Sequence, residues 1–120
     1  MTTTPAQTTL RQRREATVRE HIDAENRHDP DAVVATFSPT RASYDVPAFG
    51  EAGQPADAPA VRAMWAGFIT AFPDVHIEPG PFYYGDTHIF VEVRMTGTQQ
   101  ADFAGIPATG RSFDARMACL

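Results

Sequence analysis

The chain has 120 residues, a length that suits one domain built around one hydrophobic core. Hydrophobic residues make up 42% of the chain and charged residues 21%, which is typical of a globular protein and excludes wholesale disorder. The net charge of -5 provides no attraction to nucleic acid or to an anionic membrane, so neither is expected as a partner.

The single cysteine, Cys119, allows no internal disulfide, which favours a reducing compartment. The first residues, MTTTPAQTT, lack the apolar run of a secretory signal. No later segment approaches the roughly 20 apolar residues that a membrane span requires. These features predict a cytoplasmic protein.

Three helices are predicted in the first part of the chain, after a flexible tail over residues 1–8. The first helix spans residues 9–28, and its thin apolar stripe favours a position over a sheet edge or a cavity rim. Asp29 and Pro30 suit the start of a short second helix. Asp57 caps the third helix, whose wide apolar face consists of Val61, Met64, Trp65, Phe68, Ile69 and Phe72.

Strand-like segments fill most of the remaining chain. Residues 42–46 alternate as a strand, and residues 47–59 form a loop with a short strand near Glu51. Gly85-Asp86 indicates a hairpin between residues 82–84 and residues 88–96. A last strand begins near Arg111. The two apolar faces of these later strands are Ile89, Val91, Val93 and Met95, and Phe113, Ala115, Met117 and Cys119.

This order of elements predicts an α+β domain over residues 9–120. Three helices from the N-terminal half of the chain pack on a curved antiparallel sheet. A sheet curved in this way can close over its helices and leave a deep apolar pocket.

Three segments resemble the SnoaL-like polyketide cyclase (ester cyclase) family of the nuclear transport factor 2-like superfamily. They are HIDAENRHDPDAVVATFSP, AVRAMWAGFITAFPDVHIEP and VEVRMTGTQQADFAGIPATGRSFDARM, and together they cover most of residues 16–120. The combination of FPD with GIPATGR carries the resemblance. It implies a cone-shaped, cystatin-like fold and a homodimer through the sheet. It also implies acid–base chemistry on a polyketide-like carbonyl compound, without a metal or an organic cofactor.

The sequence departs from the family pattern at two places. The family often has Gly-Thr-His at the end of the hairpin arm, where this chain has Gly97-Thr98-Gln99. The family usually continues with a further strand pair, whereas this chain stops at Leu120. The resemblance therefore implies a domain shortened at its C-terminus, with the last strand or strands of the sheet missing.

Asp114 and Gln99 are the candidate catalytic residues. The resemblance implies an acid–base Asp in the strand after the GIPATGR loop, where Asp114 lies. Alternation instead places Asp114 beside Arg116 on the polar face, as an exposed ion pair. Gln99 continues the odd-numbered apolar face and is predicted either to orient a substrate carbonyl or to bond to the following loop.

The predicted pocket lining is largely aromatic and aliphatic, as ligand pockets usually are. Tyr44 and Tyr84 are either core aromatics with satisfied hydroxyls or donors to a developing enolate oxygen. The full predicted lining is Tyr44, Trp65, Phe68, Phe72, Tyr84, Val91 and Val93. The four histidines show no metal-ligand spacing, so no metal site is expected.

Three functions agree with these features. The first is a cofactor-independent cyclase or isomerase acting on a small apolar carbonyl compound. The second is a non-catalytic domain that binds an apolar ligand. The third is a module that dimerises through its sheet. The fold alone cannot choose among them, because one scaffold supports unrelated functions.

Overall fold

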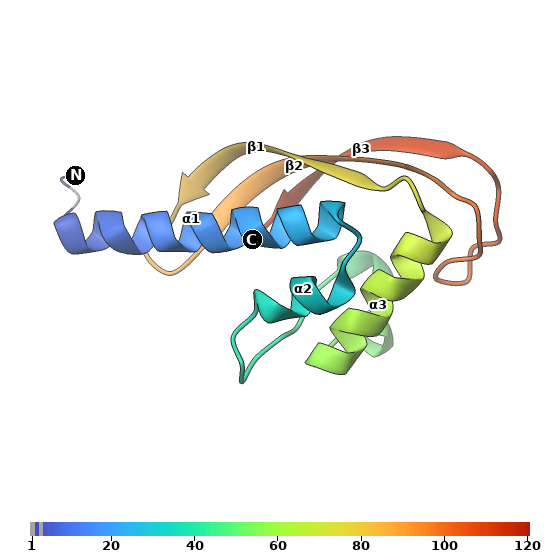
Figure 1. The fold of residues 1–120 in the computed structure, drawn as a ribbon, viewed down its shortest axis with the longest axis horizontal. Coiled ribbons are helices and arrows are strands. Elements are labelled where there is room, and N and C mark those ends of the chain that lie inside the picture. Colours follow the sequence, from blue (N-terminus) through green and yellow to red (C-terminus); the bar gives the residue numbers. More distant parts are fainter. Residues whose placement is uncertain (1, 3) are drawn as a thin grey trace.

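A computed structural model describes residue 2 and residues 4–120 as three α-helices and a three-stranded antiparallel sheet (Figure 1). The helices are α1 (Pro5–Asn26), α2 (Pro30–Ala35) and α3 (Ala58–Ala71). The strands are β1 (His76–Tyr84), β2 (Ile89–Thr98) and β3 (Ser112–Cys119). The curved sheet lies over the helices, which confirms the predicted α+β class with its helices on one side of the sheet.

Helix α1 begins at Pro5, four residues before the predicted start. Thr4 is its N-cap and accepts a hydrogen bond from the Gln7 amide, while the Gln7 side chain accepts one from the Thr4 amide. This reciprocal capping box satisfies two amide groups that the helix itself cannot pair. The predicted tail over residues 1–8 is therefore helical from Pro5, and residues 1 and 3 lie outside the described part.

The predicted strand over residues 42–46 is wrong, because this extended segment pairs with no strand. The Tyr44 amide donates to the carbonyl of Pro55, and the Val46 amide donates to the side chain of Gln54. Where a short strand was predicted near Glu51, the chain forms two short 3-10 helices, η1 (Pro47–Phe49) and η2 (Glu51–Gly53). The segment is thus held by its own loop and not by the sheet.

The predicted hairpin is confirmed, and the sheet order is β1-β2-β3. Strand β1 contains an irregularity between Pro79 and Phe82. Because side chains alternate along a strand, this insertion shifts the inward face from odd to even residues. Ile77 and Phe82 therefore share one face of the sheet, opposite Met95 and Val91 respectively.

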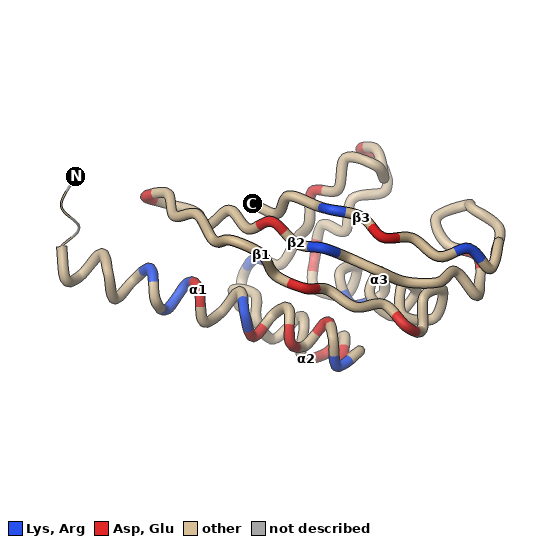
Figure 2. The backbone as a smooth tube through the Cα atoms, turned by 90° about the horizontal axis from the view of Figure 1, so that it is seen from above, with Lys and Arg blue, Asp and Glu red and all other residues tan. Residues whose placement is uncertain are grey.

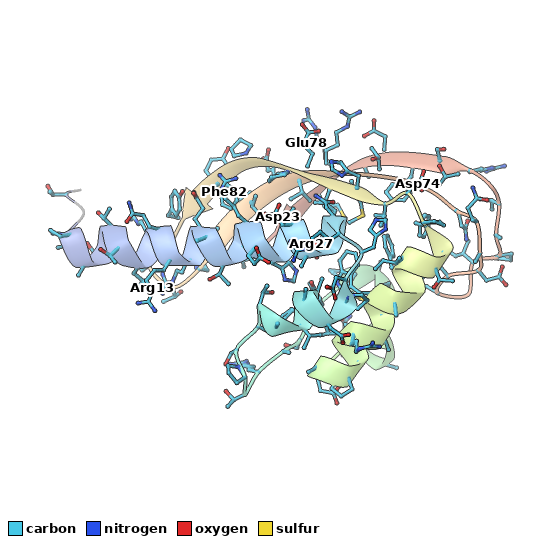
Figure 3. All side chains as sticks on the ribbon, viewed as in Figure 1. Arg13, Asp23, Arg27, Asp74, Glu78 and Phe82 are labelled. Atoms are coloured by element: carbon cyan, nitrogen blue, oxygen red, sulfur yellow. The ribbon has the colours of Figure 1, made fainter. Side chains whose placement is uncertain are left out.

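Helix α1 packs along β1, an edge strand of this sheet, as its thin apolar stripe predicted. At one end the Asn26 side chain forms two 2.8 Å hydrogen bonds with the backbone of Ile77. Further along, the Arg19 guanidinium lies 4.4 Å from the centre of the Phe82 ring, which Figure 3 shows between helix and strand. Near the helix start, Arg11 lies over the ring of Tyr84.

The core lies between these helices and the inner face of the sheet. Residue Trp65 of α3 is 5% exposed, and the apolar face predicted for this helix points inward. Gly97 of β2 allows close packing nearby, because a Cβ atom there would come within 3.0 Å of the Phe113 ring. The buried members of the core are Ile22, Ala24, Val33, Val61, Trp65, Val75, Ile77, Val91, Val93 and Met95.

The outer face of the sheet is charged. Basic and acidic positions both occur along the strands (Figure 2), and Glu78 points outward from β1 (Figure 3). Arg94 and Asp114 form a two-pronged ion pair across β2 and β3, with nitrogen–oxygen distances of 2.8 and 2.6 Å. Within the described residues, no helix combines the length and the apolarity needed to cross a bilayer.

We predict that Asp57→Ala lowers the free energy of unfolding by about 1 kcal/mol, as the loss of an N-cap usually does. The Asp57 carboxylate accepts a hydrogen bond from the Ala60 amide at 2.9 Å, and alanine cannot replace it. Urea unfolding followed by circular dichroism measures the change. Asp57→Asn is the control and should keep most of the stability, whereas equal losses in both variants would contradict a capping role.

Candidate acid–base site

Two ionisable side chains of α1 form the centre of the site. His21 and Glu25 are one helical turn apart, so their side chains lie on the same face of the helix. His21 Nε2 lies 2.9 Å from Glu25 Oε1. The His21 side chain is 19% exposed and the Glu25 side chain 7% exposed. A carboxylate this far removed from water requires a hydrogen-bond partner, and His21 is one.

The Tyr44 hydroxyl connects this pair to α3. Its oxygen lies 2.6 Å from His21 Nε2 and 3.3 Å from Glu25 Oε1, and it accepts a hydrogen bond from Trp65 Nε1 at 3.2 Å. The extended segment around Tyr44 places this hydroxyl between α1 and α3. Phe37, just after α2, encloses the site by packing edge-on against the His21 and Tyr44 rings.

Thr36 determines which nitrogen of the His21 ring carries a hydrogen. The Thr36 hydroxyl donates to the Val33 carbonyl at 2.7 Å, so its oxygen is left to accept from His21 Nδ1 at 2.7 Å. Hydrogen-bond directions of this kind are the usual basis for assigning a histidine tautomer. This arrangement assigns a ring hydrogen to Nδ1, and Nε2 faces Glu25 and Tyr44.

With Nδ1 assigned as the donor to Thr36, the triangle of His21 Nε2, Glu25 Oε1 and the Tyr44 oxygen has room for a second hydrogen besides that of Tyr44. If the Tyr44 hydrogen were alone, two acceptor lone pairs would face each other across the 2.9 Å between Nε2 and Oε1. A second hydrogen, shared by His21 and Glu25, turns that contact into a hydrogen bond. The geometry therefore favours a pair that stores one mobile proton.

Burial raises the pKa of Tyr44 far above its ordinary value, and the nearby Glu25 carboxylate raises it further. Tyr44 consequently keeps its proton and acts as a neutral hydrogen-bonding group. Partial desolvation likewise raises the pKa of the Cys119 thiol in β3, with Glu25 as the second cause, although Cys119 as a residue is exposed.

The second carboxylate oxygen of Glu25, Oε2, takes no part in these bonds. Among the described residues, no buried side-chain nitrogen or oxygen lacks a hydrogen-bond partner. It follows that Oε2 is not completely enclosed, although the Glu25 side chain is only 7% exposed. His21 and Glu25 belong to no larger metal-binding group, since the described residues contain no set of three His, Cys, Asp or Glu side chains placed to hold a metal ion.

The structure places Asp114 on the outer face of the sheet, away from this cluster. It is exposed, and its hydrogen bonds to Arg94 hold the pKa of its carboxyl below the usual range. A general base needs a raised pKa and access to the substrate, so this position argues against catalysis by Asp114. The ion pair expected from alternation is present, but its partner is Arg94 and not Arg116.

Gln99 is 6% exposed, and its side chain forms hydrogen bonds with the following loop. Its Nε2 donates to the carbonyls of Ala101 and Ile106, and its Oε1 accepts from the Thr109 hydroxyl at 2.9 Å. Of the two roles predicted for Gln99, the structure supports the bond to the loop. A substrate carbonyl would have to displace these bonds.

The predicted pocket residues are divided among several places. Tyr44 and Trp65 meet in the acid–base cluster. Phe68 and Phe72 stack at 4.8 Å and pack with Phe103, and Val91 and Val93 lie in the core of the sheet. Tyr84 is 41% exposed and donates a hydrogen bond to Glu15 of α1. Tyr84 thus fastens the helix to the sheet.

Sequence reasoning missed His21, Glu25 and Thr36. The available signal was the spacing of His21 and Glu25, two ionisable groups at i and i+4 within the segment HIDAE. Nothing local in the sequence shows that Tyr44 and Thr36 meet this pair.

The chain matches the family model of the SnoaL-like domain over residues 18–120. Three solved structures illustrate the similarity of fold. A proposed SnoaL-like polyketide cyclase from Jannaschia sp. CCS1 has 17% identity and a TM-score of 0.71 over 97% of this chain and 77% of its own. AclR, a proposed hydroxylase from Streptomyces galilaeus, has 22% identity and a TM-score of 0.69 over 88% of this chain and 75% of its own.

The third is an uncharacterised cystatin-fold protein from Novosphingobium aromaticivorans, with 22% identity and a TM-score of 0.54 over 86% of this chain and 83% of its own. At these identities the structures establish similarity of fold alone. No curated protein matches the chain significantly.

We predict that nitrogen-15 spectra show hydrogen on Nδ1 of His21, because Thr36 presents only an acceptor to that atom. Thr36→Val removes the acceptor and should change the Nδ1 resonance, whereas Thr36→Ser should preserve it. Multiple-bond proton–nitrogen correlation spectra at neutral pH measure both. A His21 ring protonated at Nε2 alone would contradict the assignment.

Proposed function

The chain belongs to the SnoaL-like domain family, and from this membership we propose that it performs cofactor-independent acid–base chemistry on a small apolar carbonyl compound. The His21–Glu25 pair exchanges the proton. The observation that carries the proposal is the partly enclosed contact of 2.9 Å between His21 Nε2 and Glu25 Oε1.

The proposed step removes a proton from the carbon next to the substrate carbonyl. The electrons of the carbon–hydrogen bond form the carbon–carbon double bond of an enolate, and the carbonyl electrons move to oxygen. The proton passes to Oε2 of Glu25, the oxygen that takes no part in the triangle with His21 and Tyr44. Protonation of the enolate, or its attack on a second carbonyl in the same molecule, completes an isomerisation or a ring closure.

His21 supports this step by sharing the mobile proton with Glu25. Positioned acids and bases of this kind typically contribute 10²–10⁴-fold to a rate. Tyr44 is a positioning residue, because its neutral hydroxyl fixes the pair while Trp65 fixes the hydroxyl. The apolar surroundings of the pair favour an apolar substrate and strengthen the electrostatic contacts within the site.

Exchange of carbon-bound hydrogen with solvent tests the step without requiring the natural substrate. We predict that the protein accelerates exchange at the carbons next to the carbonyl of 2-decanone in heavy water, followed by proton NMR. Glu25→Gln keeps the shape of the side chain but cannot accept the proton, so it should reduce the acceleration on the order of 10²-fold. His21→Asn should also reduce it.

Asp114→Asn is the matched control, since it removes a carboxylate from the outer face of the sheet and should leave exchange unchanged. Equal acceleration by the wild type and by Glu25→Gln would refute the role of this pair. A wild-type protein that binds 2-decanone without accelerating exchange would instead identify a non-catalytic domain for apolar ligands.

A further inference from the structure

Helix α1 presents a second face beside the one that packs on β1. Leu10, Arg14, Val18, His21 and Glu25 follow one another at steps of three or four residues, so they form one stripe along the helix. The C-terminal end of this stripe is the His21–Glu25 pair. Its N-terminal half lines an open groove of about 460 Å³ between α1, the β1–β2 hairpin and Leu120.

The chemistry of the groove is apolar with a basic rim. Apolar side chains of α1, β2 and the chain end account for much of its lining: Leu10, Val18, Ile89 and Leu120. Arg13 and Arg14 of α1 lie at its edge with His88 of the hairpin, and Figure 3 shows Arg13 on α1 beside the hairpin turn. No aspartate or glutamate is among the described residues that line it.

This local excess of positive charge is unusual in a chain whose net charge is -5. The Arg14 guanidinium is held in place, because Nη1 donates to the backbone carbonyl of Asp86 in the hairpin turn at 3.0 Å. Its remaining donors stay available at the rim. An apolar surface beside two guanidinium groups, of which that of Arg14 is held in place, is complementary to an apolar molecule that carries an anionic group.

We propose that this groove binds the anionic end of the substrate, which is therefore an apolar carbonyl compound bearing a carboxylate. The binding of the carboxylate is independent of the proposed function. The placement of the carbonyl at His21 and Glu25 rests on that function. The carboxylate pairs with Arg13 and Arg14, and the apolar body follows Val18 along the helix.

The helix determines the distance between the two ends of such a substrate. Arg14 and His21 are seven residues apart, and Arg14 and Glu25 are eleven residues apart. At a rise of 1.5 Å per residue, these separations are roughly 10 and 16 Å along the helix axis. A carboxylate and a carbonyl at opposite ends of a medium-length chain reach the level of His21, one helical turn before Glu25, whereas those of a short keto acid do not.

Decanoate tests the anion site independently of any reaction. We expect its NMR titration to shift the resonances of Leu10, Thr17, Val18 and Ile89. The double variant Arg13→Gln/Arg14→Gln should raise the dissociation constant roughly tenfold or more, since each arginine loses a charge-assisted bond. Arg13→Gln alone should have a smaller effect in the same direction.

Two controls make this measurement specific. Arg27→Gln also removes a charge from α1, but near the C-terminal end and in an exposed pair with Glu20, so it should leave decanoate binding unchanged. The neutral analogue 1-decanol should bind the wild type and the double variant alike. Equal binding of decanoate to the wild type and the double variant, or shifts that map away from the groove, would overturn the proposal.

The link to the reaction is tested with 9-oxodecanoate, which has the carbon chain of decanoate and a ketone near its far end. Its exchange in heavy water should exceed that of 2-decanone in the wild type, and this advantage should vanish in the double variant. Glu25→Gln should reduce this exchange on the order of 10²-fold yet still bind decanoate. If the wild type binds decanoate in the groove but accelerates no exchange, the proposed reaction is refuted and the anion site remains. If the wild type exchanges 9-oxodecanoate and 2-decanone at equal rates, the anion site is refuted and the reaction remains.

Discussion

The packing of α1 along β1 is the constraint on which the site depends. Contacts with the strand recur on one side of the helix, from Arg11 over Tyr84 at one end to Asn26 on Ile77 at the other. Fifteen helical residues rise about 22 Å, and seven strand residues rise about 23 Å, so the two elements remain matched over this length. Because this side is fixed, the C-terminal part of the adjacent stripe, which ends in Glu25, faces the interior.

The buried Tyr44 hydroxyl contacts two helices that are distant from it in the sequence. Tyr44 lies on an extended segment without a sheet partner, yet its oxygen contacts α1 through His21 and α3 through Trp65. Burying a hydroxyl without partners is costly, so these bonds also secure the position of the segment. The same constraint holds the His21–Glu25 pair in a fixed geometry, which is what a proton-transfer site requires.

The charged side chains on the two sides of the sheet lie in different surroundings. On the outer face, Arg94 and Asp114 neutralise each other in solvent, where such a pair contributes little to stability. On the helix side of the sheet, the carboxylate of Glu25 is largely removed from water, and the exposed Arg13 and the half-buried Arg14 border an apolar groove. The charged groups on the helix side are therefore placed to interact electrostatically with a molecule bound there.

The sequence by itself determined the elements that depend on neighbouring residues. Periodicity and the Asp57 cap predicted α3, and alternation with Gly85-Asp86 predicted the hairpin. The combination of FPD with GIPATGR indicated the family. The tertiary structure alone decided that residues 42–46 pair with no strand in the described part of the chain and that Phe82 faces inward. It also assembled the site from His21, Glu25 and Tyr44. The physical reason is range: capping and periodicity act over a few residues, whereas a bulge that reverses a strand face and a hydroxyl that reaches a histidine 23 positions away depend on how the whole chain packs.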